Sequence, residues 1–340
     1  MNPYTFIVGS TRSGTTLLQR LVNAHPQIAV VHETHWIARY FEKRTGLTPE
    51  GFVTPELIPK LLEYHRFPKM KVGREQLERL IDSDEPVSYP SFVSAIFDLY
   101  GQRKGKSLVG DKTPSYVLNI PTLHGLWPKA KFVHIIRDGR DVCLSMLNWK
   151  KAQVAAGRLA TWTEDPVLTT ALWWKQRVRL GREDGIALGP ELYYEIRYET
   201  LVSQPATECA ALCDFLGLPY DDAMLRFYEG REKADFGLDA KRAWRPITSG
   251  LRDWRSQMPL DDIERFEAAA GDLLDELGYP RAVPDPPQEK LENAARIRHA
   301  FTQEVRTQGM RTTGAIPQPA NTRREGGSEC PANTSPPARC

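Results

Sequence analysis

The sequence has little net charge, few cysteines and no long apolar run, and each shortage excludes a class of protein. Lysine and arginine exceed aspartate and glutamate by only 2 in 340 residues, which gives no electrostatic basis for binding nucleic acid. No run of about 18 apolar residues occurs, so no membrane span is expected. The first apolar run begins within a few residues of the N-terminus, which leaves no room for a signal peptide. We therefore expect a cytoplasmic protein.

The 5 cysteines give no disulfide or metal pattern. Their number is odd, and no CxxC or histidine-rich motif accompanies them. Cys209 and Cys213 are four residues apart in a helical pattern, and we interpret them as small core residues.

Short β-branched runs alternate with helical patterns over most of the chain. Strands are predicted at residues 4–8, 28–31, 107–109, 131–136 and 192–196. Helices are predicted at residues 15–24, from about 140 to 149, 205–216 and 263–277. This alternation predicts an α/β fold with a central, mostly parallel sheet flanked by helices.

Two segments depart from the alternation. Residues from about 40 to 105 carry helical patterns separated by Pro and Gly, which indicates a helical insert. Residues 308–340 are rich in Pro, Gly, Ser and Thr, a composition that predicts a disordered tail. We therefore expect one domain over residues 1–307.

The segment FIVGSTRSGTTLL, residues 6–18, has the outline of a phosphate-binding loop without its lysine. Gly9 and Gly14 enclose four residues, but Thr15 stands where a nucleotide-binding loop has lysine. A glycine-bearing turn before a helix directs backbone N–H groups at an anion. A ligand-free turn is the alternative, but it needs far fewer donors than this loop offers. The donor side chains are Ser10, Arg12, Ser13, Thr15 and Thr16.

A second candidate phosphate site follows the run KFVHII in the segment RDGRDVCLSMLNW. Arg137 stands at the end of the predicted strand, and Ser145 follows about two helical turns later. Both can reach one point above the carboxyl edge of the sheet, where open α/β sheets bind ligands. Alternatively, Asp138 and Arg140 pair with each other at the surface and Ser145 faces solvent.

Together these two segments resemble those of sulfotransferases that use 3′-phosphoadenosine 5′-phosphosulfate. The resemblance extends from about residue 4 to residue 280, with a gap across the insert. It implies a fold like that of P-loop nucleoside kinases, this donor as co-substrate, and no required metal. In that family the first loop holds the 5′-phosphosulfate, and residues matching Arg137 and Ser145 hold the 3′-phosphate. This donor has no β- and γ-phosphates, so a lysine that binds those phosphates is not needed.

The resemblance also implies roles for single residues. Lys112, in DKTP, is similar to the family lysine that reaches the phosphosulfate bridge. From its place in the first loop, Arg12 is expected to stabilise the charge on the leaving group. Tyr198, in IRYETLVSQP, is similar to a tyrosine that lies against the adenine. Arg245, in WRPITSGLRDWR, is similar to a basic residue that returns to the nucleotide. The alternatives are a solvated lysine, a core tyrosine and a basic surface turn.

The general base is expected in the segment HETH. Cytosolic small-molecule sulfotransferases carry a histidine where this chain has Pro114. HETH resembles the segment of protein-tyrosine sulfotransferases in which a glutamate acts as base, which implies Glu33. His32 and His35 are the alternatives. These histidines are three residues apart at a strand end, which does not match the zinc helix with histidines four apart.

We therefore expect sulfuryl transfer by in-line displacement to an acceptor hydroxyl or amine. A kinase or nucleotide hydrolase is disfavoured by the missing lysine, and a non-catalytic nucleotide-binding scaffold by the presence of Glu33, Arg12 and Lys112. The acceptor stays open between a small molecule, a carbohydrate and a peptide. The basic segment 59–74 either receives an acidic acceptor or is a solvated face.

Overall fold

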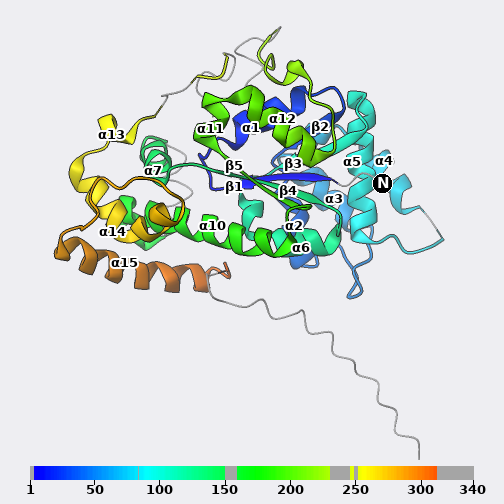
Figure 1. The fold of residues 1–340 in the computed structure, drawn as a ribbon. Coiled ribbons are helices and arrows are strands. Elements are labelled where there is room, and N and C mark those ends of the chain that lie inside the picture. Colours follow the sequence, from blue (N-terminus) through cyan, green and yellow to red (C-terminus); the bar gives the residue numbers. More distant parts are fainter. Residues whose placement is uncertain (1–3, 83, 150–158, 230–245, 249–251, 312–340) are drawn as a thin grey trace, which may run out of the picture.

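Five parallel strands form the central sheet of the protein (Figure 1). The structure is a computed structural model that describes residues 4–82, 84–149, 159–229, 246–248 and 252–311. The strands are β1 (Thr5–Gly9), β2 (Ile28–His32), β3 (Leu108–Lys112), β4 (Lys131–Ile136) and β5 (Tyr193–Arg197). Their order in the sheet is β2-β3-β1-β4-β5, and the paired strands run parallel. The predicted α/β fold class is confirmed.

Both faces of the sheet are buried, because successive side chains of a strand point to opposite faces. In β1, Ile7 belongs to one hydrophobic cluster, and Phe6 and Val8 belong to another. The Ile7 face is covered by α1 (Thr15–Ala24), α11 (Tyr198–Ser203) and α12 (Pro205–Leu216). Cys209 and Cys213 are buried free thiols of this cluster, which confirms the prediction of core residues.

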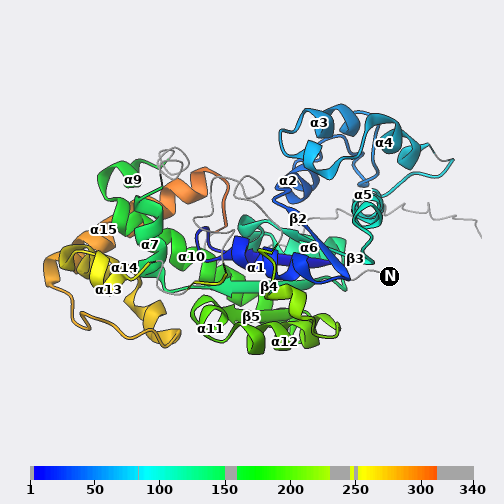
Figure 2. The ribbon, with the colours of Figure 1, turned by 90° about the horizontal axis from the view of Figure 1, so that it is seen from above.

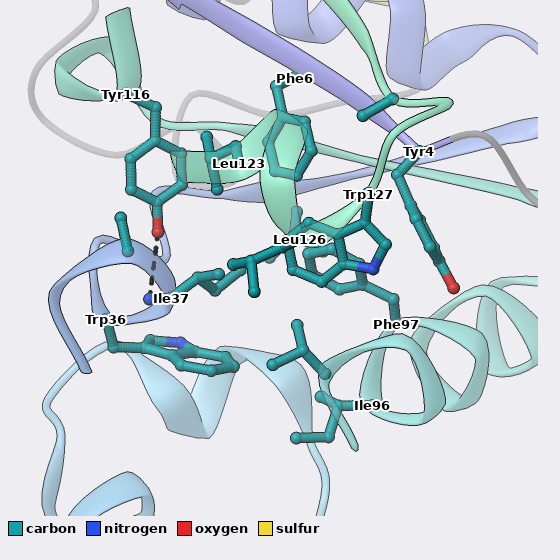
Figure 3. Packing of buried hydrophobic residues seen from close by; sticks show 14 of the residues in the cluster. Tyr4, Phe6, Trp36, Ile37, Ile96, Phe97, Tyr116, Leu123, Leu126 and Trp127 are labelled. Atoms are coloured by element: carbon teal, nitrogen blue, oxygen red, sulfur yellow. Dashed lines mark hydrogen bonds between the residues drawn. The ribbon is translucent and has the colours of Figure 1, made fainter. Parts of the chain in front are cut away.

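The opposite face carries α6 (Ile120–Leu126) and α10 (Pro166–Leu188), and beside it lie the helices of the insert. The insert follows α2 (Trp36–Glu42) and lies at the β2 end of the sheet (Figure 2). Its elements are α3 (Leu57–Glu63), η1 (Phe67–Met70), α4 (Arg74–Ile81) and α5 (Tyr89–Lys104). Phe6, Trp36 and Phe97 belong to one buried cluster that joins the insert to the sheet (Figure 3).

A third cluster joins the C-terminal helices to the chain after β4. It contains residues of α7 (Gly139–Leu147), α10, α14 (Leu260–Glu276) and α15 (Gln288–Thr307). Two short helices, α9 (Ala160–Glu164) and α13 (Trp254–Gln257), also contribute to it. Sequence patterns alone predict neither α10 nor α15.

The predicted tail boundary falls just after α15. Residues 308–311 belong to the described chain, and Arg311 Nη2 donates to Asp184 Oδ1 at 3.0 Å. Residues 312–340 lie outside the described residues, so the disordered tail and the domain limits stay predictions.

The strands end at one edge of the sheet. Gly9 is in register with Ile135, and His32 with Lys112. Candidate residues that directly follow a strand therefore lie along that edge, where open parallel sheets bind ligands. They are Ser10, Glu33, Arg137 and Tyr198.

Candidate active site

The loop between β1 and α1 presents polar side chains suited to an anion. Ser10 and Ser13 are 1% and 0% exposed, and their hydroxyl oxygens have no hydrogen-bond partner within the described chain. A buried polar atom without a partner costs free energy, so these hydroxyls fit an anion that would accept hydrogen bonds from them. Thr15 and Thr16 begin α1, at the positive end of its dipole.

The two glycines of this loop are required by close approach. At Gly14 φ is +99°, and a Cβ there would lie 2.4 Å from Cδ2 of Tyr198. A Cβ on Gly9 would lie 2.6 Å from the carbonyl oxygen of Ile135. The loop backbone therefore packs directly against β4 and the start of α11.

Arg12 joins the loop to α7. Its Nε donates to Oγ of Ser145 at 2.9 Å, and its guanidinium carbon lies 5.2 Å from the centre of the Trp149 ring. Ser145 is 5% exposed, so the alternative of a solvent-facing serine is wrong. The two predicted phosphate segments thus meet in space.

Arg137 lies at the end of β4 between an aromatic ring and a carboxylate. Its guanidinium carbon is 4.1 Å from the centre of the Tyr198 ring, and its Nη2 donates to Asp141 Oδ2 at 2.9 Å. Its Nε is buried and has no partner among the described residues, so this guanidinium can still donate to an anion. Because the Tyr198 ring also covers Gly14, it contacts both predicted phosphate segments.

Asp138 and Arg140 pair, but not at the surface. Arg140 is 0% exposed, and its Nη2 donates to Asp138 Oδ2 at 2.8 Å. Its Nη1 donates to Glu267 of α14 at 2.6 Å, and its guanidinium carbon lies 3.6 Å from the centre of the Trp254 ring. The surface alternative is wrong because α13 and α14 cover this turn.

The carboxylate of Glu33 contacts cationic side chains through both oxygens. Oε1 accepts a hydrogen bond from Lys112 Nζ at 2.8 Å, and Oε2 accepts one from Arg66. Oε2 also lies 3.6 Å from Nε2 of His35. Burial acts to raise the pKa of Glu33, but His35, Lys112 and Arg66 outweigh it and hold this pKa well below its ordinary value. Glu33 is therefore ionised at neutral pH, the form that can accept a proton.

Lys112 and the two histidines complete this cluster. Lys112 is 0% exposed, so the alternative of a solvated lysine is wrong. Its Nζ lies 3.4 Å from Nε2 of His32, and burial together with the Lys112 charge lowers the pKa of His32 to about 4. His35 Nδ1 lies 3.1 Å from Ser115 Oγ. Pro114 is buried beside them at the start of η2 (Pro114–Leu118).

Arg66 is a residue of the candidate site that no sequence pattern singles out. It directly precedes η1 in the insert and comes from the basic segment 59–74. For that segment the sequence predicts only an acceptor surface or a solvated face. The Arg66 side chain is 28% exposed and forms an ion pair with Glu33, so the insert supplies one charge of the candidate site.

Three further predictions concern Arg245, a metal site and a membrane span. Arg245 lies outside the described residues. In the described parts of the chain, no three His, Cys, Asp or Glu side chains gather closely enough to hold a metal ion. The helices of those same parts include none long and apolar enough to cross a bilayer.

Comparison with known proteins points to one family. Residues 3–222 match the Sulfotransferase family. The chain is 25% identical over 290 residues to protein-tyrosine sulfotransferase A of Caenorhabditis elegans, covering 83% of this chain and 69% of that protein. It is 25% identical over 321 residues to the omega-hydroxy-beta-dihydromenaquinone-9 sulfotransferase of Mycobacterium tuberculosis, covering 84% of this chain and 77% of that protein.

A solved structure has a similar fold. It is the sulfotransferase domain from the olefin synthase of Synechococcus PCC 7002, with a TM-score of 0.51 and 24% sequence identity. The match covers 82% of this chain and 95% of that chain.

Proposed function

Since the chain belongs to the sulfotransferase family, we propose that it transfers a sulfuryl group from 3′-phosphoadenosine 5′-phosphosulfate to an acceptor hydroxyl or amine. One observation carries the proposal. The carboxylate of Glu33 lies 2.8 Å from Lys112 Nζ, at the sheet edge that also carries the partnerless hydroxyls of Ser10 and Ser13. Such a transfer requires a base, a cation, and hydrogen-bond donors for the anionic oxygens.

Two groups of residues would hold the donor. The β1–α1 loop would bind the 5′-phosphosulfate through Ser10, Ser13 and the N-terminus of α1. Arg137 and Ser145 would bind the 3′-phosphate, with the Tyr198 ring beside the adenine. The partnerless Nε of Arg137 supports this assignment, because a buried guanidinium gains from a charged acceptor. Arg245 would add a further cation.

Glu33 would take the proton of the acceptor hydroxyl as that oxygen attacks sulfur. When bound, the donor supplies a sulfuryl group on a bisphosphate leaving group. Lys112 and Arg12 would stabilise the negative charge that develops on the leaving side. In the resting site His35, Lys112 and Arg66 hold the pKa of Glu33 low. A cation that turns from Glu33 to the donor raises that pKa, so donor binding would strengthen the base.

The relatives favour a hydroxyl acceptor over an amine. One is named for protein tyrosine and the other for an omega-hydroxy dihydromenaquinone, and each of these acceptors presents a hydroxyl group. We therefore infer that the acceptor atom here is a hydroxyl oxygen.

Calorimetry tests the donor site, with adenosine 3′,5′-bisphosphate and ATP titrated in the absence of Mg²⁺. The bisphosphate should bind clearly more tightly than ATP. Arg137→Ala should weaken its binding by roughly 1.5–3 kcal/mol, the usual worth of a hydrogen bond to a charged group. Equal affinity for the two nucleotides, or normal binding by Arg137→Ala, would contradict the donor assignment.

Turnover tests the chemistry. The donor is offered with 4-methylumbelliferone, a tyrosine peptide, a long-chain primary alcohol and an amino sugar, and sulfated product is measured. Glu33→Gln should keep bisphosphate affinity while kcat falls by roughly 10²–10⁴-fold. Glu75→Gln, whose side chain is 87% exposed, is the matched control and should retain activity. If Glu33→Gln turns over normally and His32→Asn or His35→Asn does not, the base is that histidine.

A further inference from the structure

The turn that carries Glu33 has an unusual backbone. φ is +49° at Glu33 and +48° at His35, a conformation that side chains with a Cβ disfavour. Such residues persist only where surrounding contacts hold them, and they cluster at functional sites. The contacts of the turn therefore decide where the Glu33 carboxylate lies.

Thr34, between these two residues, makes the contacts that hold the turn. It is 3% exposed, and its backbone N–H donates to Oγ1 of Thr113 at 2.9 Å. Its own Oγ1 lies 2.7 Å from the hydroxyl oxygen of Tyr116, and either hydroxyl can donate. We call Thr34, Thr113 and Tyr116 the Thr34 clamp.

Tyr116 anchors the clamp in the core. It is 2% exposed, and its ring packs edge-on to Phe6 with ring centres 6.2 Å apart. Its hydroxyl also accepts a hydrogen bond from the backbone nitrogen of Ile37 at 3.2 Å (Figure 3). One buried hydroxyl thus contacts both the Glu33 turn and the start of α2.

The clamp ties Glu33 to the strand end that carries Lys112. Thr113 directly follows Lys112, and the N–H of Glu33 donates to the Lys112 carbonyl oxygen at 2.8 Å. We propose that Thr34 and Tyr116 are positioning residues: their hydroxyls hold the Glu33 carboxylate against Lys112 and affect the reaction through Glu33. This inference rests on the base role proposed for Glu33.

Nearly isosteric variants test the proposal without opening a cavity. Tyr116→Phe keeps the ring, Thr34→Val keeps the branched shape, and Thr34→Ser keeps the hydroxyl. Tyr89→Phe is the matched control, because Tyr89 is equally buried and donates to the Ile37 carbonyl oxygen at 2.8 Å, outside the clamp. For each variant, kcat and KM with 4-methylumbelliferone are measured, with melting temperature and affinity for adenosine 3′,5′-bisphosphate.

Tyr116→Phe and Thr34→Val should each lower kcat by roughly tenfold to a hundredfold, the usual effect of a misplaced catalytic group. Bisphosphate affinity should stay unchanged, Thr34→Ser should restore most of kcat, and Tyr89→Phe should leave kcat normal. In a Glu33→Gln background, Tyr116→Phe should cause no further loss, because residues that act through one group are not additive.

Three results would overturn the proposal. The first is a normal kcat in the Thr34→Val/Tyr116→Phe double variant. The second is a loss of kcat from Tyr116→Phe that is as large in the Glu33→Gln background as in the unaltered protein. The third is a loss of kcat in Tyr89→Phe as large as that in Tyr116→Phe. Failure of the proposed function gives a different result, since Glu33→Gln itself would then turn over normally or the unaltered protein would sulfate none of the acceptors.

Discussion

Replacing Gly14 by alanine tests how closely the loop packs against Tyr198. The new Cβ would lie 2.4 Å from Cδ2 and 2.9 Å from Cε2 of that ring, well inside van der Waals contact. The residue would also keep a φ of +99°. A left-handed conformation costs about 1–2 kcal/mol and overpacking about 1–3 kcal/mol. The free energy of unfolding should therefore fall by about 2–5 kcal/mol, a large part of the usual stability of a domain.

The same substitution should weaken donor binding. The Tyr198 ring that must move lies against the guanidinium of Arg137, 4.1 Å from its centre. A displaced Arg137 would lose the charge-assisted hydrogen bond proposed to the 3′-phosphate, worth roughly 1.5–3 kcal/mol. Affinity for adenosine 3′,5′-bisphosphate should therefore fall at least about tenfold.

Urea unfolding and calorimetry measure these two effects, with Gly125→Ala as the matched control. Gly125 lies in the exposed part of α6, and a Cβ there meets nothing within 4 Å. That variant should be as stable as the unaltered protein or more stable by up to about 1 kcal/mol, because alanine favours a helix over glycine. If Gly14→Ala matched Gly125→Ala in stability and bound the bisphosphate normally, the packing argument would be refuted.

Two further substitutions test polar side chains of the fold outside the candidate site. Lys106→Met should lower the free energy of unfolding by about 1–3 kcal/mol in urea denaturation, because the Lys106 ammonium satisfies carbonyl oxygens between the last turn of α1 and the start of β2. These are the carbonyls of Asn23, His25 and Ile28, at 2.6, 2.9 and 3.1 Å. Lys129→Met, at an exposed lysine, is the control. Burial lowers the pKa of His134 to about 3, so the unfolded chain takes up a proton at this residue between about pH 6.5 and pH 3 while the folded chain does not. This residue therefore lowers stability on acidification by at most about 1.4 kcal/mol per pH unit. His134→Gln should lose less stability than the unaltered protein between pH 7 and pH 4, and parallel curves would argue against this.

The sequence predicts best those elements whose ends are marked by residues next to them in the chain. The bounds of α1, β4 and α12 agree with their predictions, at Thr15–Ala24, Lys131–Ile136 and Pro205–Leu216. Each is an apolar pattern next to a glycine, proline or polar cluster that stops it. The prediction fails at β3, which was placed at residues 107–109 but continues through Lys112. Charged residues usually end a buried strand, but Asp111 and Lys112 are both 0% exposed.

The helices that were not predicted lack a readable amphipathic period or follow a stretch that interrupts the helical pattern. α10 is buried on most sides, so its apolar residues do not form one stripe. α15 follows Gly278 and four prolines, which interrupt the helical pattern, although Ala294, Ile297, Phe301 and Val305 form a helical stripe. Their packing partners are distant in sequence, and local patterns do not encode them.

The site shows the same division between local and distant information. Ser10, Glu33, Lys112 and Arg137 each lie in or directly after a strand, and a parallel sheet brings all strand ends to one edge. Their proximity could therefore be predicted from strand positions alone. Arg66 lies in the insert, for which no comparable rule exists. Its neighbour Phe67 packs against Trp36 in one buried cluster, and this contact between distant segments holds Arg66 near Glu33.

Glu33 has contacts with both the sheet and the insert. Its backbone is held by the sheet through the Lys112 carbonyl and the Thr34 clamp, whereas one cation on its carboxylate comes from the insert. The strength of a carboxylate base depends on the charges within a few ångströms. Sequence changes in the insert can therefore adjust the pKa of Glu33 while the loop between β1 and α1 stays unaltered. In the base role proposed for Glu33, the sheet would fix the position of the carboxylate that takes the proton, and the insert would adjust its pKa.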